Sequence, residues 1–231
     1  MAGNIDNRDK ILGILKEKSS LKQDVFHTTI NVFNDFKKVI KEMVDDFKTE
    51  SAKIDKRIAI DFVDKSEYEM HLKVAGDIMV FSMHTNVFEF DKSHPITKTS
   101  YIKNNVYNSY CGVINVYNFL SDSFKYNRIN DVGYLIGRIF INKELHYYVE
   151  GKRQIVLRHN DFVNVQIDKA IIKDIIESLI LYCLEFDLYT PPFESVGQIS
   201  VMEIQEASNN VLIKTGKRLG FQFMAEDDGS K

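Results

Sequence analysis

The chain has 231 residues, of which 44% are hydrophobic and 27% charged, and these values are ordinary for a globular protein. A net charge of -3 excludes a general attraction to nucleic acid or to an anionic membrane, so any such contact needs a local patch. The two cysteines, Cys111 and Cys183, lack metal-ligand spacing and lie among apolar residues, which indicates buried thiols in a reducing compartment.

Residues 1–55 predict an N-terminal helical segment. A short amphipathic pattern around Ile11–Leu15 is followed from Asp24 by apolar residues at seven-residue spacing. Ser19 and Ser20 suggest a break between the two parts. The broad stripe fits a helix that covers the chain's own sheet equally well as a helix that pairs with a second chain. As the residues of such an interface we predict Phe26, Phe33, Phe36, Ile40 and Phe47.

Alternation of apolar and polar residues predicts four strands between Arg57 and Phe90. With Gly76 and Asp77 as the turn of a hairpin, one strand face is apolar and Glu69 lies opposite His84 on the other face. That face also carries His71, and two imidazoles with one carboxylate are suitable ligands for a divalent metal. Histidines on the outer face of a hairpin are more often simply solvated, so no metal is expected, and Glu69, His71 and His84 are only weak candidates.

The stretch 101–130 has apolar residues at helical spacing, although many of its residues are poor helix formers, and we expect a helix there. A strongly apolar helix follows from about Val165 to Leu188, capped by Asp161 or Asn164. Beyond Pro191 and Pro192, a helix over 195–210, a final strand over 211–223 and an acidic flexible tail over 224–231 complete the prediction. The α+β domain is expected to span residues 56–223.

The strongest hairpin signal lies in 133–154. With residues 142–144 as a three-residue loop, Ile141 lies opposite Leu145 and Arg138 opposite Tyr148, whereas a two-residue turn would exchange the faces of the first strand. The three-residue loop places four polar residues on one face as candidates for catalysis: Arg138, His146, Tyr148 and Glu150.

An imidazole beside a carboxylate and an arginine can serve acid–base chemistry on a phosphorylated substrate. The same four residues equally describe an exposed sheet face with cross-strand pairs. Basic residues flank this hairpin on both sides and are interleaved with tyrosine, a pattern that suits a nucleic-acid backbone. These candidates for anion or nucleic-acid binding are Lys125, Tyr126, Arg128, Lys152, Arg153 and Arg158.

The sequence has no glycine-rich phosphate loop and no HExxH, GxSxG or CxxC motif. We therefore expect an α+β protein in which a long N-terminal helix and a buried C-terminal helix pack on an antiparallel sheet of about six strands. Its expected role is that of an interaction or regulatory subunit rather than an enzyme, which self-associates or docks onto another protein through the phenylalanine-rich helix.

Two alternatives stay open: an enzyme or sensor for a phosphorylated or nucleotide-like small molecule, and a nucleic-acid-binding protein. The polar N-terminus favours a cytoplasmic location. No cofactor and no membrane contact are expected, because charges interrupt the most apolar window, 170–188.

Overall fold

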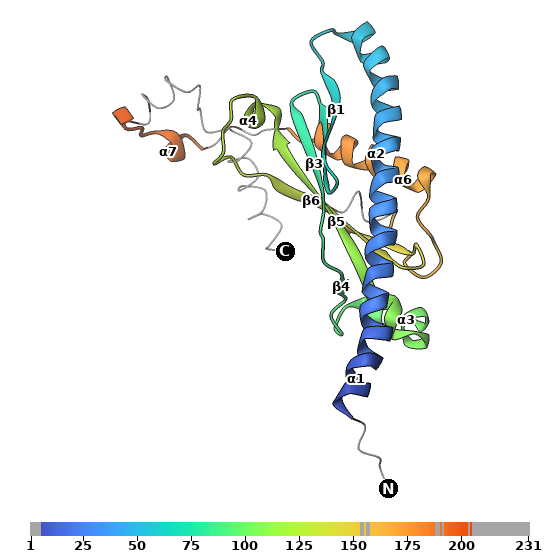
Figure 1. Ribbon diagram of the computed structural model, residues 1–231. Coiled ribbons are helices and arrows are strands. Elements are labelled where there is room, and N and C mark those ends of the chain that lie inside the picture. The colour runs from blue at the N-terminus through green and yellow to red at the C-terminus, as the bar shows by residue number, and fades with distance from the viewer. Residues whose placement is uncertain are drawn as a thin grey trace.

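A computed structural model of the protein describes residues 6–152, 155, 158–187, 190, 192–202 and 204. These residues form an α+β arrangement of helices on one antiparallel sheet, and the predicted fold class is confirmed (Figure 1). The helical elements are α1 (Asn7–Ile14), η1 (Leu15–Ser19), α2 (Ser20–Ile54), η2 (Pro95–Lys98), α3 (Ser100–Asn104), η3 (Val106–Ser109), α4 (Ser121–Lys125), α6 (Lys169–Leu184) and α7 (Phe193–Val196). The strands are β1 (Ile60–Ser66), β2 (Glu69–Val74), β3 (Asp77–Met83), β4 (Phe88–Glu89), β5 (Tyr110–Leu120), β6 (Tyr134–Asn142) and β7 (Tyr147–Gly151).

One long helix runs through α1, η1 and α2 without interruption. The break expected at Ser19 and Ser20 is instead a π-helical turn, and the Ser20 hydroxyl donates to the carbonyl of Leu15 at 3.3 Å. Figure 1 shows the long helix against the sheet, with α1 extending past the strands at its N-terminal end. Only the α2 part of this helix therefore packs along the sheet.

The sheet has the strand order β1-β2-β3-β5-β6-β7, and β4 pairs with β5. Both predicted hairpins form, but each turn lies one residue from its expected position. In β2–β3, Val74 pairs with Asp77, so Ala75 and Gly76 make the turn and Glu69 faces Ser82 instead of His84. Moving a turn of fixed length by one residue changes every pairing by two residues, so each side chain keeps its predicted face.

The β6–β7 hairpin shows the same displacement. Ile141 pairs with Tyr147 and Arg138 with Glu150, so the predicted partners Leu145 and Tyr148 are wrong. The cause is Asn142, whose side-chain oxygen accepts hydrogen bonds from the backbone N–H of Glu144 at 2.9 Å and of His146 at 3.0 Å. Asn142 thereby ends the strand, and Leu145 closes the loop in a left-handed conformation with φ of 65°.

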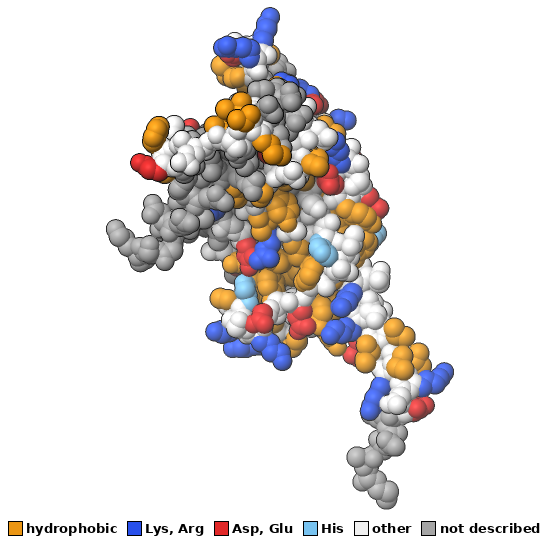
Figure 2. Space-filling model, turned by 90° about the vertical axis from the view of Figure 1, so that its left-hand side faces the viewer, with side chains coloured by type: hydrophobic (Ala, Val, Ile, Leu, Met, Phe, Trp, Pro, Cys, Tyr) orange, Lys and Arg blue, Asp and Glu red, His pale blue; other side chains and the backbone are white. Residues whose placement is uncertain are grey.

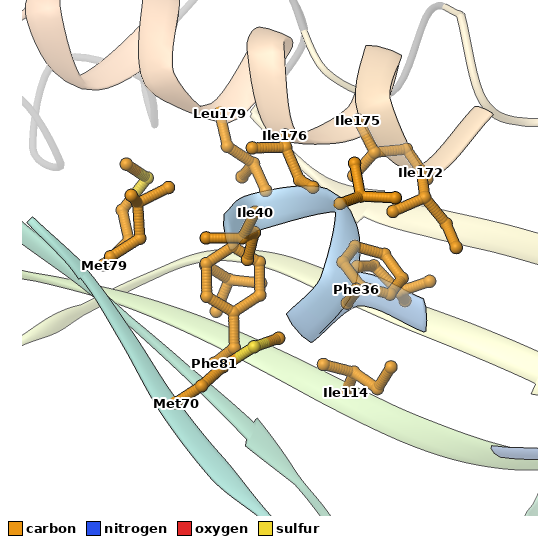
Figure 3. Packing of buried hydrophobic residues seen from close by; sticks show 14 of the residues in the cluster. Phe36, Ile40, Met70, Met79, Phe81, Ile114, Ile172, Ile175, Ile176 and Leu179 are labelled. Atoms are coloured by element: carbon orange, nitrogen blue, oxygen red, sulfur yellow. The ribbon is translucent and has the colours of Figure 1, made fainter. Parts of the chain in front are cut away.

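The main core lies between the sheet, α2 and α6. Figure 3 shows α2 passing between α6 and the strands, so that side chains of all three layers meet around it. The labelled side chains are Phe36 and Ile40 of α2, Met70, Met79, Phe81 and Ile114 of the strands, and Ile172, Ile175, Ile176 and Leu179 of α6. Complete burial of one such side chain stabilises the fold by about 1.5–3 kcal/mol. The apolar stripes predicted on α2 and α6 are the faces that this core buries.

The predicted helix over 101–130 is wrong for its central part, because Tyr110–Leu120 is the central strand β5. Valines, tyrosines and asparagines there are poor helix formers. Although the apolar residues recur at helical spacing, the segment instead pairs with β3 and β6 as a strand. Only short helices, α3 and α4, flank the strand.

Helix α6 begins four residues later than expected, at Lys169, and ends at Leu184. Its N-cap is Asp168, whose carboxylate accepts from the backbone N–H of Ile171 at 2.8 Å, instead of Asp161 or Asn164. Those two residues form a separate turn, in which the Asp161 carboxylate accepts from the backbone of Asn164 at 3.1 Å. The predicted strand 211–223 and the tail 224–231 lie outside the described residues, as do residue 203 and residues 205–210 of the helix predicted over 195–210. The described part of that helix prediction is wrong at its start, because α7 ends at Val196 and residues 197–200 are not helical.

Candidate functional site

The sheet face opposite α2 and α6 carries a row of polar side chains that runs across five strands. The strand register places Glu69 beside Ser82, Ser82 beside Asn115, Asn115 beside Arg138 and Arg138 beside Glu150. We call these five residues the polar row. Mostly apolar and aromatic residues flank it on both sides, namely Val63, His71, Val80, Tyr117 and Leu135 on one side and Val113, Phe140 and Tyr148 on the other.

Arg138 and Glu150 form an ion pair at the β7 end of the polar row. The Arg138 Nε donates to Glu150 Oε2 at 2.9 Å, and the Nη2 donates to the same oxygen. The side chain of Arg138 is 45% exposed and that of Glu150 is 28% exposed. The pair is therefore open to solvent on one side, and its charges compensate each other.

His94 comes from the loop before η2 and joins this pair. Its Nδ1 accepts from the backbone N–H of Ile96 at 3.3 Å, which leaves the proton of a neutral ring on Nε2, 3.6 Å from Glu150 Oε1. Phe90 stacks on the His94 ring at 4.8 Å, and Tyr148 meets it edge-on at 5.6 Å. The imidazole is thus held in one orientation by two rings and one backbone group.

A hollow of about 280 Å³ adjoins His94 and Tyr148. Its remaining lining comes from η2, Thr99 and the segment 160–163, with Phe162 buried at its base. Burial and the nearby Glu150 raise the pKa of the Tyr148 hydroxyl, which therefore stays protonated at neutral pH. His94 and Tyr148 line this hollow, and Glu150 and Arg138 extend the polar cluster away from it.

His146, the predicted partner of Arg138, takes part in another cluster. Its Nδ1 donates to the carbonyl of Phe162 at 2.9 Å, and its ring stacks on Tyr101 at 4.6 Å. The Tyr101 hydroxyl in turn donates to Glu144 at 2.6 Å, and burial raises its pKa. In the described part of the chain, no contact joins His146 to Arg138 or Glu150, so three of the four predicted residues meet, with His94 as the histidine.

Sequence reasoning missed His94 because its contacts with Tyr148 and Glu150 join distant parts of the chain. One local signal was available. A histidine directly before Pro95 can cap the first turn of a helix, since proline is favoured at the first helical position. Such a cap would have fixed the orientation of the ring, although not its partners.

The three weak metal candidates do not converge. His71 Nε2 lies 2.9 Å from Glu69 Oε1, but His84 accepts from the backbone of Asn86 and packs against Phe88 at 4.8 Å. Burial lowers the pKa of His71, and Glu69 only partly offsets that effect. Within the described residues, no group of three potential ligands is placed to hold a metal ion.

A relay of three polar groups lies on the helix side of β7, and two of them, Tyr147 and His159, are buried. The Tyr147 hydroxyl is 3.1 Å from His159 Nδ1, and His159 Nε2 is 3.2 Å from the carboxylate of Asp174 in α6. His159 is 3% exposed, and burial lowers its pKa, while Asp174 acts in the opposite direction. Burial also raises the pKa of Tyr147 to about 12. With Tyr147 only 4% exposed, this relay fastens β7 to α6 and is not reached by a substrate.

The basic candidates have separate environments. Lys125 and Arg128 lie over the Tyr126 ring at 4.9 and 5.4 Å, and Arg128 is 3.9 Å from Asp131. Arg158 lies 3.4 Å from Asp174 on the helix side, while Lys152 is exposed. Arg153 lies outside the described residues. Because acidic residues accompany Arg128 and Arg158, this set lacks the unopposed positive charge that a nucleic-acid backbone needs.

The predicted interface on the long helix is largely covered by the chain itself. Phe33, Phe36 and Ile40 are each 0% exposed in the core, and Phe26 and Phe47 pack partly buried against it. Phe33, Phe36 and Ile40 are therefore not available to a second chain. The phenylalanine stripe fits the other arrangement left open by the sequence, a helix that covers its own sheet.

The exposed apolar surface of the long helix lies at its N-terminal end. We call it the N-terminal patch; it comprises Ile11, Leu12, Ile14 and Leu15 of the helix and Val106 and Tyr107 of η3. Its four aliphatic side chains from the helix are each between 48% and 59% exposed. A groove of about 390 Å³ runs between helix and η3, lined by Lys10, Gly13, Ile14, Glu17, Lys18 and Tyr107.

The long helix is tied to η3 at this patch. The Tyr107 hydroxyl donates to Glu17 at 3.1 Å, and the Lys18 ammonium lies 5.5 Å from the centre of the Tyr110 ring. Side chains of η3 and of the start of β5 thus hold this end of the long helix in place.

Comparison with protein-family models, with curated proteins and with solved structures returns no match for this chain. In the described part of the chain, no helix is both long enough and apolar enough to cross a membrane.

Proposed function

We propose that the protein is an interaction subunit that self-associates through the N-terminal patch. The observation that carries the proposal is the exposure of four large aliphatic side chains on one short stretch of helix, next to an apolar groove. Contiguous apolar surface of this kind is uncommon on a monomer and marks contact sites.

A second copy of the chain suits this patch because the patch has both exposed apolar side chains and a groove that can receive them. Leu12 and Leu15 are 48% and 52% exposed on the long helix, and Gly13 opens the groove because it has no side chain, with nothing within 4 Å of the position of a Cβ. A two-fold contact requires such self-complementarity, since the same surface serves on both chains. Lys10, Glu17 and Lys18 give the rim both signs of charge.

The free energy of self-association follows from the exposed fractions of the side chains in the patch. Ile11 and Leu15 are 57% and 52% exposed, so covering the exposed half of each contributes about 1 kcal/mol, half of the value for full burial. Two such residues on each of two chains contribute about 4 kcal/mol, equivalent to about a thousandfold in the dissociation constant.

The test is the mass in solution by multi-angle light scattering at tens of micromolar. The natural chain should be dimeric, and the double variant Ile11→Glu/Leu15→Glu should be monomeric with an unchanged circular dichroism spectrum. Ile129→Glu is the matched control, because Ile129 is 83% exposed but lies in the loop after α4 at the other end of β5. A monomeric natural chain, or a double variant that remains dimeric, contradicts the proposal.

A further inference from the structure

The polar row and the hollow beside His94 are separate from the N-terminal patch and make a second surface. Figure 2 shows the molecule from the side turned away from α2, where hydrophobic side chains surround an adjoining positive and negative group. We propose that this surface binds a neutral, hydroxyl-rich ligand of the saccharide class through Arg138, Glu150, His94 and Tyr148.

The charges at the site argue against an anionic ligand. Glu150 already compensates Arg138, and the hollow has no lysine or arginine among the described residues that line it. A phosphate group that bound the remaining Nη1 of Arg138 would lie close to the Glu150 carboxylate, which repels it. The phosphorylated or nucleotide-like ligand considered from the sequence is therefore disfavoured.

The charges do not favour a cation either. Asp161, the carboxylate in the hollow, accepts hydrogen bonds from the backbone and the side-chain amide of Asn164 at 3.1 and 3.0 Å. These bonds lower the pKa of Asp161, and the carboxylate keeps its negative charge while it accepts them. Both carboxylates of the site thus already accept hydrogen bonds within the protein, and a neutral ligand can bind without displacing any of them.

Hydrogen-bonding groups of both kinds remain available. Arg138 Nη1, the Tyr148 hydroxyl and the Asn160 side chain have no hydrogen-bond partner within the described part of the chain. Ser82 and Asn115 continue the row and are partly exposed. A hydroxyl group both donates and accepts, so a ring bearing several hydroxyls can use this mixture of donors and acceptors.

Aromatic groups complete the match. A sugar ring has an apolar C–H face and a polar rim, and Tyr148 presents an aromatic ring between the hollow and the Arg138–Glu150 pair. The hollow of about 280 Å³ is close to the lower limit of about 300 Å³ for ligand pockets. It therefore suits one ring of a saccharide, while the polar row extends away from it for further rings.

Saturation-transfer difference NMR with maltose, cellobiose and N,N′-diacetylchitobiose as probes tests this proposal. We expect transfer to at least one disaccharide, and a loss of at least half of that signal in both Tyr148→Ala and Arg138→Ala. The matched control is Tyr126→Ala, because Tyr126 is also partly exposed, at 37%, but lies after α4, and it should retain the signal. Circular dichroism shows whether each variant is folded.

Three results would overturn the proposal. The first is no transfer to any of the three disaccharides, and the second is transfer that persists undiminished in Tyr148→Ala and Arg138→Ala. The third is binding of inorganic phosphate or a short oligothymidine that depends on Arg138, which would identify an anion site. None of these results bears on the dimer, because the two surfaces share no residue.

Discussion

Replacement of Gly112 by alanine tests how closely α2 lies on the sheet. A Cβ at Gly112 would lie 2.7 Å from Thr29 Cγ2 and 2.8 Å from Thr29 Cβ. Carbon atoms pack best at about 3.5–4.0 Å, so α2 would have to move by about 0.7 Å or more. A side-chain rotation cannot relieve the contact, because the Cβ of Thr29 is fixed to the helix backbone.

We expect Gly112→Ala to lower the free energy of unfolding by about 3 kcal/mol, the upper end of the usual cost of overpacking. For a chain of this size, that loss corresponds to a melting temperature about 6–12 °C lower. Thermal unfolding followed by circular dichroism measures the shift.

The control is Gly137→Ala, on the same face of the neighbouring strand, where the added Cβ would meet Leu179 Cδ2 at 3.4 Å, an ordinary contact. Adding Thr29→Gly to Gly112→Ala removes the clash and should recover part of the lost stability. If Gly112→Ala melts within 2 °C of the natural chain, the stated closeness of helix and sheet is refuted.

Three further predictions concern α6, the relay around His159 and the N-terminal groove. Asp168→Ala should lower the free energy of unfolding by about 1 kcal/mol in urea titrations, because the Ile171 N–H loses its cap; no change would show that the cap is dispensable. Burial lowers the pKa of His159 below its ordinary value of 6.5, so the folded state binds fewer protons than the unfolded state. The stability that comes from keeping His159 neutral is therefore complete above pH 6.5 and is lost as the pH falls below it. His159→Gln should therefore flatten the decline of the urea midpoint between neutral and acidic pH, whereas His27→Gln, an exposed histidine on α2, should leave it as it is. Gly13→Ala should weaken self-association, because the added Cβ enters the proposed contact groove, and light scattering at tens of micromolar should show more monomer. At protein concentrations low enough for the monomer, the same variant should melt at a higher temperature, since alanine favours a helix over glycine by up to about 1 kcal/mol and the position is open. An unchanged dimer fraction would show that the groove takes no part in the contact.

The periodic patterns of apolar residues in the sequence were sufficient to predict the fold class. The apolar stripe of α2 and the alternation in β2, β3 and β6 identified these elements because each buries one face against the same core. The strand β5 was mistaken for a helix because its apolar residues also recur at helical spacing, and only pairing with β3 and β6 decides between the two.

Hairpin registers were off by two residues because the turn positions depend on local hydrogen bonds, above all those of Asn142. A register error of two residues leaves every side chain on its predicted face of the sheet, so Arg138, Tyr148 and Glu150 were correctly assigned to one face. His94 was not predicted as a site residue, since its contacts with Tyr148 and Glu150 join two distant segments of the chain and produce no periodic pattern in the sequence. The burial of Phe33 and Phe36 could not be separated from an interface, because both arrangements require the same apolar stripe.

The π-helical turn at Leu15–Ser19 sets the direction in which the N-terminal patch faces. A π turn contains an extra residue within an otherwise regular helix, and each residue of an α-helix corresponds to about 100° of rotation. Deleting one residue from this turn would restore a regular helix and swing Ile11 and Leu15 around the axis, away from their present direction, while α2 stays in the core. Insertions and deletions of single residues at this point therefore offer a way to redirect the contact surface of the protein without changing its fold.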